Sequence, residues 1–310
     1  MREDLIALID LGSNSIQLAI YNIDNTGNHY YEVNRVKVTA RLINYLNKQG
    51  NVTNEGIDLI LTALMDFQKV CRTYGVSRAI GFATAVIRNS SNQNEVLTKI
   101  YKKTKFSFSV LSEYEEAYYG YLGVIQSTDL QDGITIDIGG GSTELTLFRK
   151  RKMIQYHSFP FGAVNLNESF TKGKKVTNQQ VVRLRNYLLT QFHSLPWLDK
   201  AELPVIGIGG SAKNLSRIYQ SKSTKKQLNL TLSEIKSLFT ELSSLDVDER
   251  SKIRGLSKKR KDIIIPAVQT VSLLMEVVQS PYFVYCEKTV RDGVIFAHLQ
   301  NASNTQLSGD

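Results

Sequence analysis

The sequence predicts an α/β protein with two lobes, and three observations support this prediction. The chain has 310 residues and 42% hydrophobic content, which is long for one domain and sufficient for two cores. Two segments, residues 5–21 and 134–148, each consist of an apolar strand ending in aspartate, a glycine and serine turn, and a second strand. Elsewhere, strand-like runs alternate with helical runs. A polar stretch at 129–133 marks the boundary, so we expect lobes at residues 1–127 and 128–310.

The first lobe should continue from its strand, turn and strand through a polar segment, residues 35–41. A helix follows, because Thr53 or Asn54 can cap its start and apolar residues recur at helical spacing. Gly75 can adopt the left-handed conformation that ends it. The remaining expected elements are a strand at 79–83, a helix at 95–101, a strand at 106–111 and a helix at 113–125.

The second lobe should follow its own strand, turn and strand with similar alternation. Residues 263–278 are apolar nearly all round, so this helix should be buried between its neighbours. The other expected elements are a strand at 154–161, a helix at 179–192, a strand at 205–208, a glycine-rich loop opening onto a helix at 212–219, and a helix from 232.

The two aspartate turns carry the strongest functional signal. In both, the turn joins two strands, whereas a dinucleotide fingerprint or a P-loop leads from a strand into a helix. Gly139, Gly140 and Gly141 can expose successive amides as an anion nest, and Ser142 and Thr143 add hydroxyl donors. These residues predict phosphate binding, with a plain turn as the alternative.

Asp10 and Asp137 each end an apolar strand, where an unpaired carboxylate would be costly to bury. A divalent cation would resolve that cost, and Mg²⁺ usually binds one or two carboxylates together with substrate phosphates. The alternative is that each carboxylate accepts hydrogen bonds from turn amides.

The start of the helix at 113–125 carries three carboxylates with different expected roles. Ser112 and Glu115 have the spacing of a capping box, and Glu113 can face solvent and favour the helix dipole. Glu116 has no such role, and it shares a helix face with Gly120 and Gly123, where another backbone could approach. Glu116 is therefore a candidate base for activating water.

Two further positions could bind phosphate. Arg88 follows a strand end and could hold a phosphate bidentately, or it could be an ordinary surface arginine. Gly209, Gly210 and Ser211 lead into a helix, whose start is a ready anion site, although this signal is weak alone.

The net charge of +9 favours a polyanionic partner without saying which one. Basic residues gather in runs that are usually solvated faces: residues 99–105, 149–152, 172–175, 222–226 and 258–261. No zinc-finger or ribonucleoprotein motif supports a nucleic-acid partner. The cysteines and histidines are isolated, and no segment reads as a signal peptide or membrane span, so we expect a cytoplasmic protein without a disulfide framework or zinc.

Taken together, these residues resemble the exopolyphosphatase and guanosine pentaphosphate phosphatase family, within the actin, Hsp70 and sugar-kinase superfamily. The matching motifs are D-x-G-S-N-S at 10–15, a T-x-A-x-R-x-A-x-N variant at 84–92, S-G-x-E-E-A at 112–117, D-I-G-G-G-S-T-E at 137–144, G-A-V-x-L-x-E at 162–168, G-x-G-G-[ST]-A at 207–212 and R-[ED]-G at 291–293. The match covers about residues 4–298. One difference is Glu113, where the family usually has glycine.

The resemblance implies two ribonuclease-H-like lobes with an interdomain cleft, and a homodimer. It implies that Glu116 is the catalytic glutamate and that Asp10 and Asp137 lie at the Mg²⁺ and water sites. The residues it implies for phosphate binding are Ser13, Asn14, Arg88, the 139–143 segment and the 209–211 loop.

The leading hypothesis is an exopolyphosphatase that uses Mg²⁺ to remove the terminal phosphate of inorganic polyphosphate. Hydrolysis of guanosine pentaphosphate (pppGpp) to ppGpp is the alternative, because both substrates need the same phosphate-binding groups. A kinase or ATPase of the wider superfamily is a rival, although such enzymes lack the S-x-x-E-E-A helix. Glu113 also keeps open a catalytically weak regulator that binds polyphosphate or an alarmone.

Overall fold

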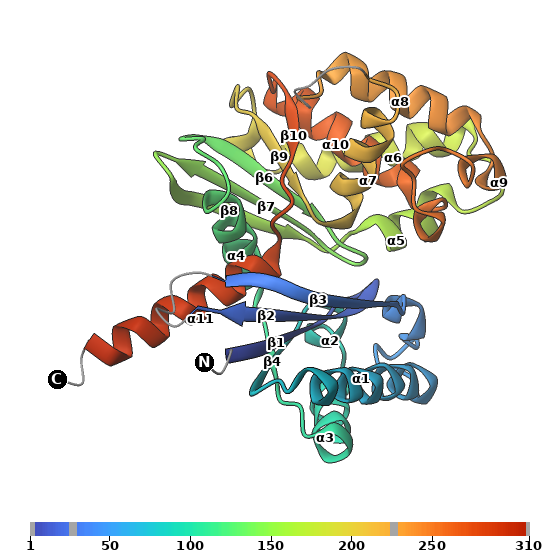
Figure 1. The fold of residues 1–310 in the computed structure, drawn as a ribbon. Helices are drawn as coiled ribbons and strands as arrows, with labels where there is room; N and C mark the ends of the chain where they lie inside the picture. The colour runs from blue at the N-terminus through green and yellow to red at the C-terminus, as the bar shows by residue number, and fades with distance from the viewer. Residues whose placement is uncertain (1–3, 25–29, 224–228, 308–310) are drawn as a thin grey trace. The chain divides into compact units, whose positions relative to one another are not determined.

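The structure is a computed structural model that describes residues 4–24, 30–223 and 229–307, with side chains described up to residue 300. The chain forms two compact units, Met1–Tyr119 with Arg291–Asp310, and Gly120–Val290 (Figure 1). It passes between the units inside helix α4 (Glu113–Ile125) and at the start of helix α11 (Val290–Leu307). The division between the units lies within α4, and the C-terminal helix belongs to the first unit, while the expected lobes at 1–127 and 128–310 stay a prediction.

The first unit contains a five-stranded sheet in the order β3-β2-β1-β4-β5. Strands β1, β2 and β3 are antiparallel neighbours, whereas β4 runs parallel to β1 and β5 parallel to β4. The bounds are β1 (Asp4–Leu11), β2 (Ser15–Ile23), β3 (Tyr30–Thr39), β4 (Arg78–Ala83) and β5 (Phe108–Val110). The segment at 35–41 was expected only to be polar, and the strand was not predicted: residues up to Thr39 belong to β3, an edge strand whose charged residues face solvent.

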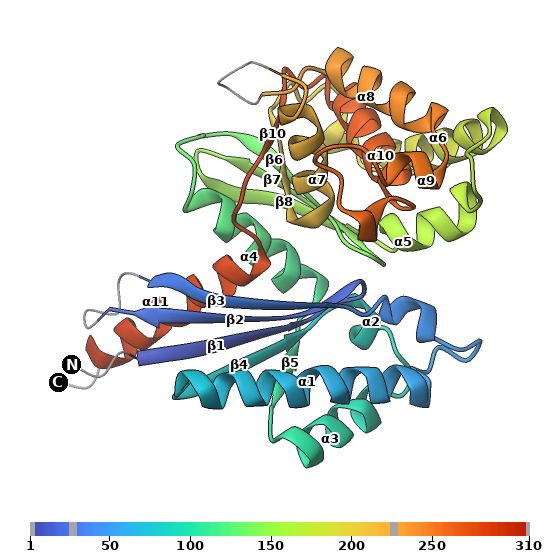
Figure 2. The ribbon, with the colours of Figure 1, turned by 45° about the vertical axis from the view of Figure 1, so that its right-hand side comes forward.

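Two helices, α1 (Asn54–Tyr74) and α3 (Gln93–Thr104), cover one face of this sheet (Figure 2). The predicted limits of α1 are confirmed: the Thr53 side chain accepts from Gly56 N at 3.3 Å, and Gly75 has a φ of 66°. The odd-numbered residues of β1 face the helices and join the core there. Because strand side chains alternate between faces, Asp10 lies on the opposite face, away from α1 and α3.

The second unit repeats this sheet, with the order β10-β9-β6-β7-β8. Its first three strands in the chain are antiparallel neighbours, and β9 and β10 are the parallel additions, as β4 and β5 are in the first unit. The bounds are β6 (Gly133–Ile138), β7 (Thr143–Arg149), β8 (Lys152–Phe159), β9 (Val205–Ile208) and β10 (Phe283–Tyr285). The two aspartate turns therefore occupy the same place in two sheets of the same topology.

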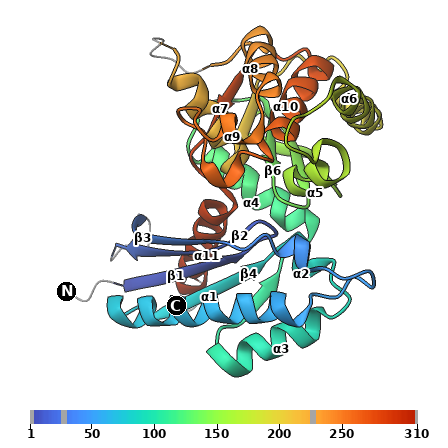
Figure 3. The ribbon, with the colours of Figure 1, turned by 90° about the vertical axis from the view of Figure 1, so that its right-hand side faces the viewer.

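Helix α10 (Ile264–Val278) is the centre of the helical layer of this unit (Figure 3). It is buried almost throughout, as its composition predicts, and it contacts α6 (Asn178–His193), α7 (Gly209–Gln220) and α8 (Leu232–Ser244). The residues expected as a glycine-rich loop, 209–211, instead form the first turn of α7. Two short helices, α5 (Ala163–Leu166) and α9 (Val247–Arg250), were not predicted.

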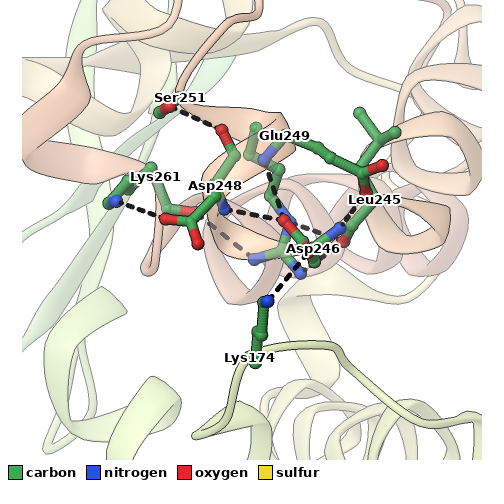
Figure 4. A network of polar contacts seen from close by, with 8 residues as sticks. Lys174, Leu245, Asp246, Asp248, Glu249, Ser251 and Lys261 are labelled. Atoms are coloured by element: carbon green, nitrogen blue, oxygen red, sulfur yellow. Dashed lines mark hydrogen bonds and ion pairs between the residues drawn. The ribbon is translucent and has the colours of Figure 1, made fainter.

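The surroundings of α9 show what a basic run can do locally (Figure 4). Asp246 caps the helix by accepting from the amides of the second and third residues after it, both at 2.8 Å. Lys174 lies 3.7 Å from Asp246, and Lys261 lies 3.2 Å from Asp248. Buried Arg250 donates to backbone carbonyls around the same turn. Members of two basic runs therefore lie in partly exposed ion pairs around this turn, and such pairs usually add little stability.

The other three basic runs, and Lys172 of the 172–175 run, also have carboxylate partners. The pairs are Lys99–Glu95, Arg149–Asp132, Lys172–Glu168 and Lys222–Glu241. The runs are thus at least partly engaged in local surface pairs, which is the ordinary role weighed from the sequence. Within the described part of the chain, no helix is long and apolar enough to cross a membrane.

Candidate active site

The two aspartate turns have the same backbone structure. We call residues 10–15 the first loop and residues 137–142 the second loop. In the first loop, Gly12 N donates to Ser15 O at 3.1 Å, and in the second, Gly139 N donates to Ser142 O at 3.0 Å. In both loops the glycine is two residues after the aspartate and the serine five residues after it. The structure therefore confirms that the two segments form the same kind of turn.

Three successive amides of the second loop face one way. The carbonyls of residues 139–141 accept from the start of α5, where the donors are Ala163 N (2.9 Å), Val164 N (3.0 Å) and Asn165 Nδ2 (3.3 Å). In a trans peptide the N–H points opposite to the carbonyl, and the described chain has no cis peptide. The amides of residues 140–142 therefore point away from α5, so successive donors lie on the same side of the loop, as the prediction of phosphate binding requires.

A close backbone contact holds this arrangement. A Cβ atom on Gly162 would lie 2.6 Å from the carbonyl carbon of Gly140, closer than real Cβ atoms approach. Only glycine lets the chain before α5 lie directly against the second loop. Gly162 and Asn165 therefore support the loop, a role that the sequence prediction did not assign to them.

The first loop has the same kind of support, from the segment after β3. The carbonyls of Ser13 and Asn14 accept from amides within residues 40–43 at 3.0 to 3.3 Å. By the same peptide geometry, the amides of Asn14 and Ser15 point away from that segment. Ser13 is buried, and Asn14 Oδ1 is buried without a hydrogen-bond partner. The first loop thus presents two amides where the second presents three.

Asp10 lies beside an arginine from the far end of the chain. Its Oδ2 is 3.4 Å from Arg291 Nη1 in the first turn of α11 and 3.5 Å from Gln17 Nε2 on β2. Burial raises the pKa of the Asp10 carboxyl, while Arg291 and then Lys37 act to lower it. The sequence prediction missed Arg291, although the R-D-G motif at 291–293 was a signal for it.

Asp137 lies against the start of α7. Gly209 has a φ of 75°, and a Cβ atom there would be 2.5 Å from Asp137 Oδ1. Glycine at this position therefore lets the carboxylate approach the helix start, where the dipole favours negative charge.

The neighbouring residues of α7 are held by side-chain contacts. Ser211 Oγ donates to Ile138 O at 2.9 Å and accepts from Arg260 Nη1 at 3.1 Å. A Cβ on Gly210 would lie 2.1 Å from Arg260 Nη2, so the guanidinium covers that glycine. The predicted phosphate role of residues 209–211 stays a prediction, and the Ser211 hydroxyl already has structural partners.

The three carboxylates at the start of α4 have different surroundings, as the sequence predicted. Ser112 N and Oγ both donate to Glu115 Oε2 at 2.8 Å, which confirms the capping box, and Glu113 is exposed. Glu116 is only 8% exposed, and its Oε2 lies 2.7 Å from Arg88 Nη1. The structure therefore brings together the predicted base and the predicted phosphate-binding arginine.

Arg88 is held by the short helix α2 (Ala85–Arg88), which follows β4. Its Nη1 also donates to Leu111 O at 2.9 Å, at the turn before α4. The Nε of Arg88 is buried without a hydrogen-bond partner. The ordinary surface role is thus excluded for Arg88, while its contact with phosphate stays a prediction.

The expected close approach along α4 is also present. A Cβ on Gly123 would lie 2.6 Å from Thr289 O, so another backbone segment crosses this helix where side chains are absent.

The Thr143 hydroxyl has a structural partner. Thr143 is fully buried, and its hydroxyl donates to Phe161 O at 2.7 Å. That hydroxyl points into the protein, so Thr143 is the weakest of the predicted phosphate contacts.

The acidic residues suit a cation that is held mainly by other ligands. Among the residues that the structure describes, no group of three or more His, Cys, Asp or Glu side chains could hold a metal ion. Asp10 and Asp137 each offer one carboxylate from one unit. Mg²⁺ is commonly bound by one or two carboxylates with water and substrate phosphates, so the chemistry of each carboxylate taken by itself suits such a cation.

Comparisons with known proteins show the family to which the chain is similar. Residues 19–302 match the Ppx/GppA phosphatase family. A bifunctional 3-dehydroquinate synthase/phosphatase of Fusobacterium nucleatum is 27% identical over 96% of this chain and 47% of its own, so the chain spans about half of that relative. Exopolyphosphatase 1 of Mycobacterium leprae is 23% identical, over 96% of this chain and 91% of that protein.

Solved structures show the same fold. The crystal structure of an exopolyphosphatase from Cytophaga hutchinsonii aligns with a TM-score of 0.84 at 23% identity, covering 96% of this chain and 98% of that one. This likeness and the repeated strand order confirm the predicted α/β fold of two ribonuclease-H-like, actin-like lobes. The predicted cleft between the lobes stays a prediction.

Proposed function

Because the chain belongs to the Ppx/GppA phosphatase family, we propose that it is an exopolyphosphatase that hydrolyses the terminal phosphate of inorganic polyphosphate. The observation that carries the proposal is the buried pair of Glu116 and Arg88, with 2.7 Å between Oε2 and Nη1. It joins a candidate base to a candidate phosphate ligand. Two relatives with similar sequence or fold are named exopolyphosphatases, which supports the substrate.

In the proposed reaction, water attacks the terminal phosphorus and its proton passes to the Glu116 carboxylate. The bond between the terminal phosphorus and the bridging oxygen breaks, and orthophosphate leaves a chain shortened by one phosphate. Arg88 would balance charge on the phosphoryl oxygens, while the amides of residues 140–142 would bind phosphate oxygens.

We propose Mg²⁺ as the cofactor, with Asp10 and Asp137 as the residues that would hold it directly or through water. When bound, the cation would supply positive charge to the phosphate oxygens. The chain's own residues would bind and orient the substrate and accept the proton. We expect the enzyme to act in the cytoplasm as a homodimer, a state that sedimentation velocity measures directly.

The test compares phosphate release from long-chain polyphosphate and from pppGpp by the wild type and by Glu116→Gln. The substitution should lower turnover of the preferred substrate by about 10²- to 10⁴-fold, the usual contribution of a general base. Glu113→Gln is the matched control, because Glu113 is exposed on the same helical turn and should retain turnover. Unchanged turnover in Glu116→Gln would sink the assignment.

The same panel decides between substrates. If the wild type releases phosphate faster from pppGpp than from polyphosphate, pppGpp is the substrate and not polyphosphate. Binding of either polyanion without hydrolysis, across several divalent cations, would instead indicate the regulator that Glu113 suggested.

A further inference from the structure

We propose that Arg291 is the resident counter-ion of Asp10, and that it keeps a divalent cation from binding Asp10 until a phosphate substrate is present. The proposal rests on the proposed role of Asp10 in holding the cation. It adds a residue that neither the sequence prediction nor the proposed reaction used.

The geometry makes Asp10 the ionic partner of Arg291. The Arg291 side chain is 6% exposed, and its Nη1 lies 3.4 Å from Asp10 Oδ2, whose side chain is 18% exposed. The Nε of Arg291 is buried without a hydrogen-bond partner. Burying a charged group without an opposite charge nearby is costly. The Asp10 carboxylate therefore lowers the cost of burying the Arg291 guanidinium, and the guanidinium lowers the cost of burying the carboxylate.

The position of Arg291 is set by how α11 packs within the first unit. A Cβ atom on Gly293 would lie 1.9 Å from Tyr119 O. The start of α11 therefore packs directly against the backbone of α4 at Tyr119, the last residue of α4 that belongs to the first unit. One turn and more along α11, His298 Nε2 lies 3.2 Å from Arg78 Nη1 on β4. Arg291 therefore reaches Asp10 from the packed start of a helix and not from a free loop.

This placement opposes a cation that arrives alone. A divalent ion at Asp10 would meet the positive charge of Arg291 a few ångströms away in a poorly hydrated setting, where like charges repel strongly. Lys37 also exerts its positive charge on Asp10. A polyphosphate brings several negative charges, which would offset both cations and admit the metal. Cation and substrate would then bind Asp10 together.

The test measures Mn²⁺ binding to the full-length chain by electron paramagnetic resonance, without phosphate. The wild type should bind Mn²⁺ weakly, and so should Arg291→Lys, which retains the charge. Arg291→Gln should bind about tenfold or more tightly, because the opposing charge is gone. The gain should disappear in the double variant Asp10→Asn, Arg291→Gln, which lacks the carboxylate.

Thermal unfolding with Mg²⁺ gives a second readout. A cation that binds only the folded state raises Tm, so Mg²⁺ should raise the Tm of Arg291→Gln and leave that of the wild type nearly unchanged. Neither readout uses turnover, so a failure of the proposed phosphatase activity would be seen separately.

Two outcomes overturn the proposal. One is Arg291→Gln binding Mn²⁺ no more tightly than the wild type. The other is a wild type that binds Mn²⁺ through Asp10 without phosphate as tightly as it does with tripolyphosphate. The second outcome decides the matter even if Arg291→Gln does not fold.

Discussion

The first and second loops share a backbone and differ in their chemistry. Both make the same turn hydrogen bond and both are supported from the segment that follows the third strand of their sheet. The first loop, however, begins with an aspartate that pairs with a buried arginine, whereas three of the six residues in the second loop are glycines, two of which have amides that point away from α5. Both loops thus carry an aspartate and outward amides, but the first places its aspartate beside a buried arginine, and the second presents one more amide.

The parallel strands beside the two loops show the same contrast. After β4 comes α2, four residues long, which ends in Arg88 and so delivers a charge to Glu116. After β9 comes α7, twelve residues long, which begins with two glycines and offers its amino end instead. Loss of the buried arginine in the first unit should therefore cost more than loss of a hydroxyl in the second loop, provided that the second-unit backbone stays intact.

The largest effect is expected for Arg88→Gln in the first unit. It removes the arginine that pairs with the buried Glu116, which should lower the free energy of unfolding by about 3–5 kcal/mol. Urea denaturation measures this loss. Arg72→Gln is the control, because Arg72 is an exposed arginine in the last turn of α1. Equal losses in the two variants would remove the contrast between buried and surface charges.

Gly162→Ala should have the next largest effect, through the backbone of the second unit. The added methyl meets the second loop at 2.6 Å, and such overpacking typically costs about 1–3 kcal/mol. We also expect a higher KM for polyphosphate, because the amides of residues 140–142 would move. A variant with the wild-type KM would show that this loop does not bind substrate through its backbone.

Thr143→Val separates structure from binding. It removes the donor to the buried Phe161 carbonyl, so the free energy of unfolding should fall by about 1–3 kcal/mol. KM should not change, because this hydroxyl points into the protein. An increase in KM without loss of stability would restore Thr143 to the phosphate-binding residues and contradict the structural role.

Ser142→Ala should have the smallest effect. The substitution deletes a hydroxyl and keeps the amide of residue 142, so KM should rise by less than about tenfold, the worth of one neutral hydrogen bond. Steady-state phosphate release measures it. A loss as large as that of Glu116→Gln would mean that the second loop, like the first unit, acts through side chains.

The sequence predicted local structure best where the residues that determine an element lie within it or next to it. The limits of α1 follow from Thr53 and Gly75, and the capping box of α4 follows from Ser112 and Glu115. Glu116 was singled out by elimination within the same few residues. Prediction was weaker for β3, whose polar edge residues hide the strand pattern, and for α9, which is short and held by contacts with distant residues.

The sequence by itself determined most of the longer elements, the duplicated loops and the chemistry that those loops can offer, because short-range backbone preferences and residue types decide these properties. Only the tertiary structure decided which charges meet: Glu116 with Arg88, and Asp10 with an arginine at the other end of the chain. It also showed that the second loop is held by Gly162 and its neighbours. The physical reason is that buried charges and loop carbonyls require partners, and those partners come from segments that packing alone brings close.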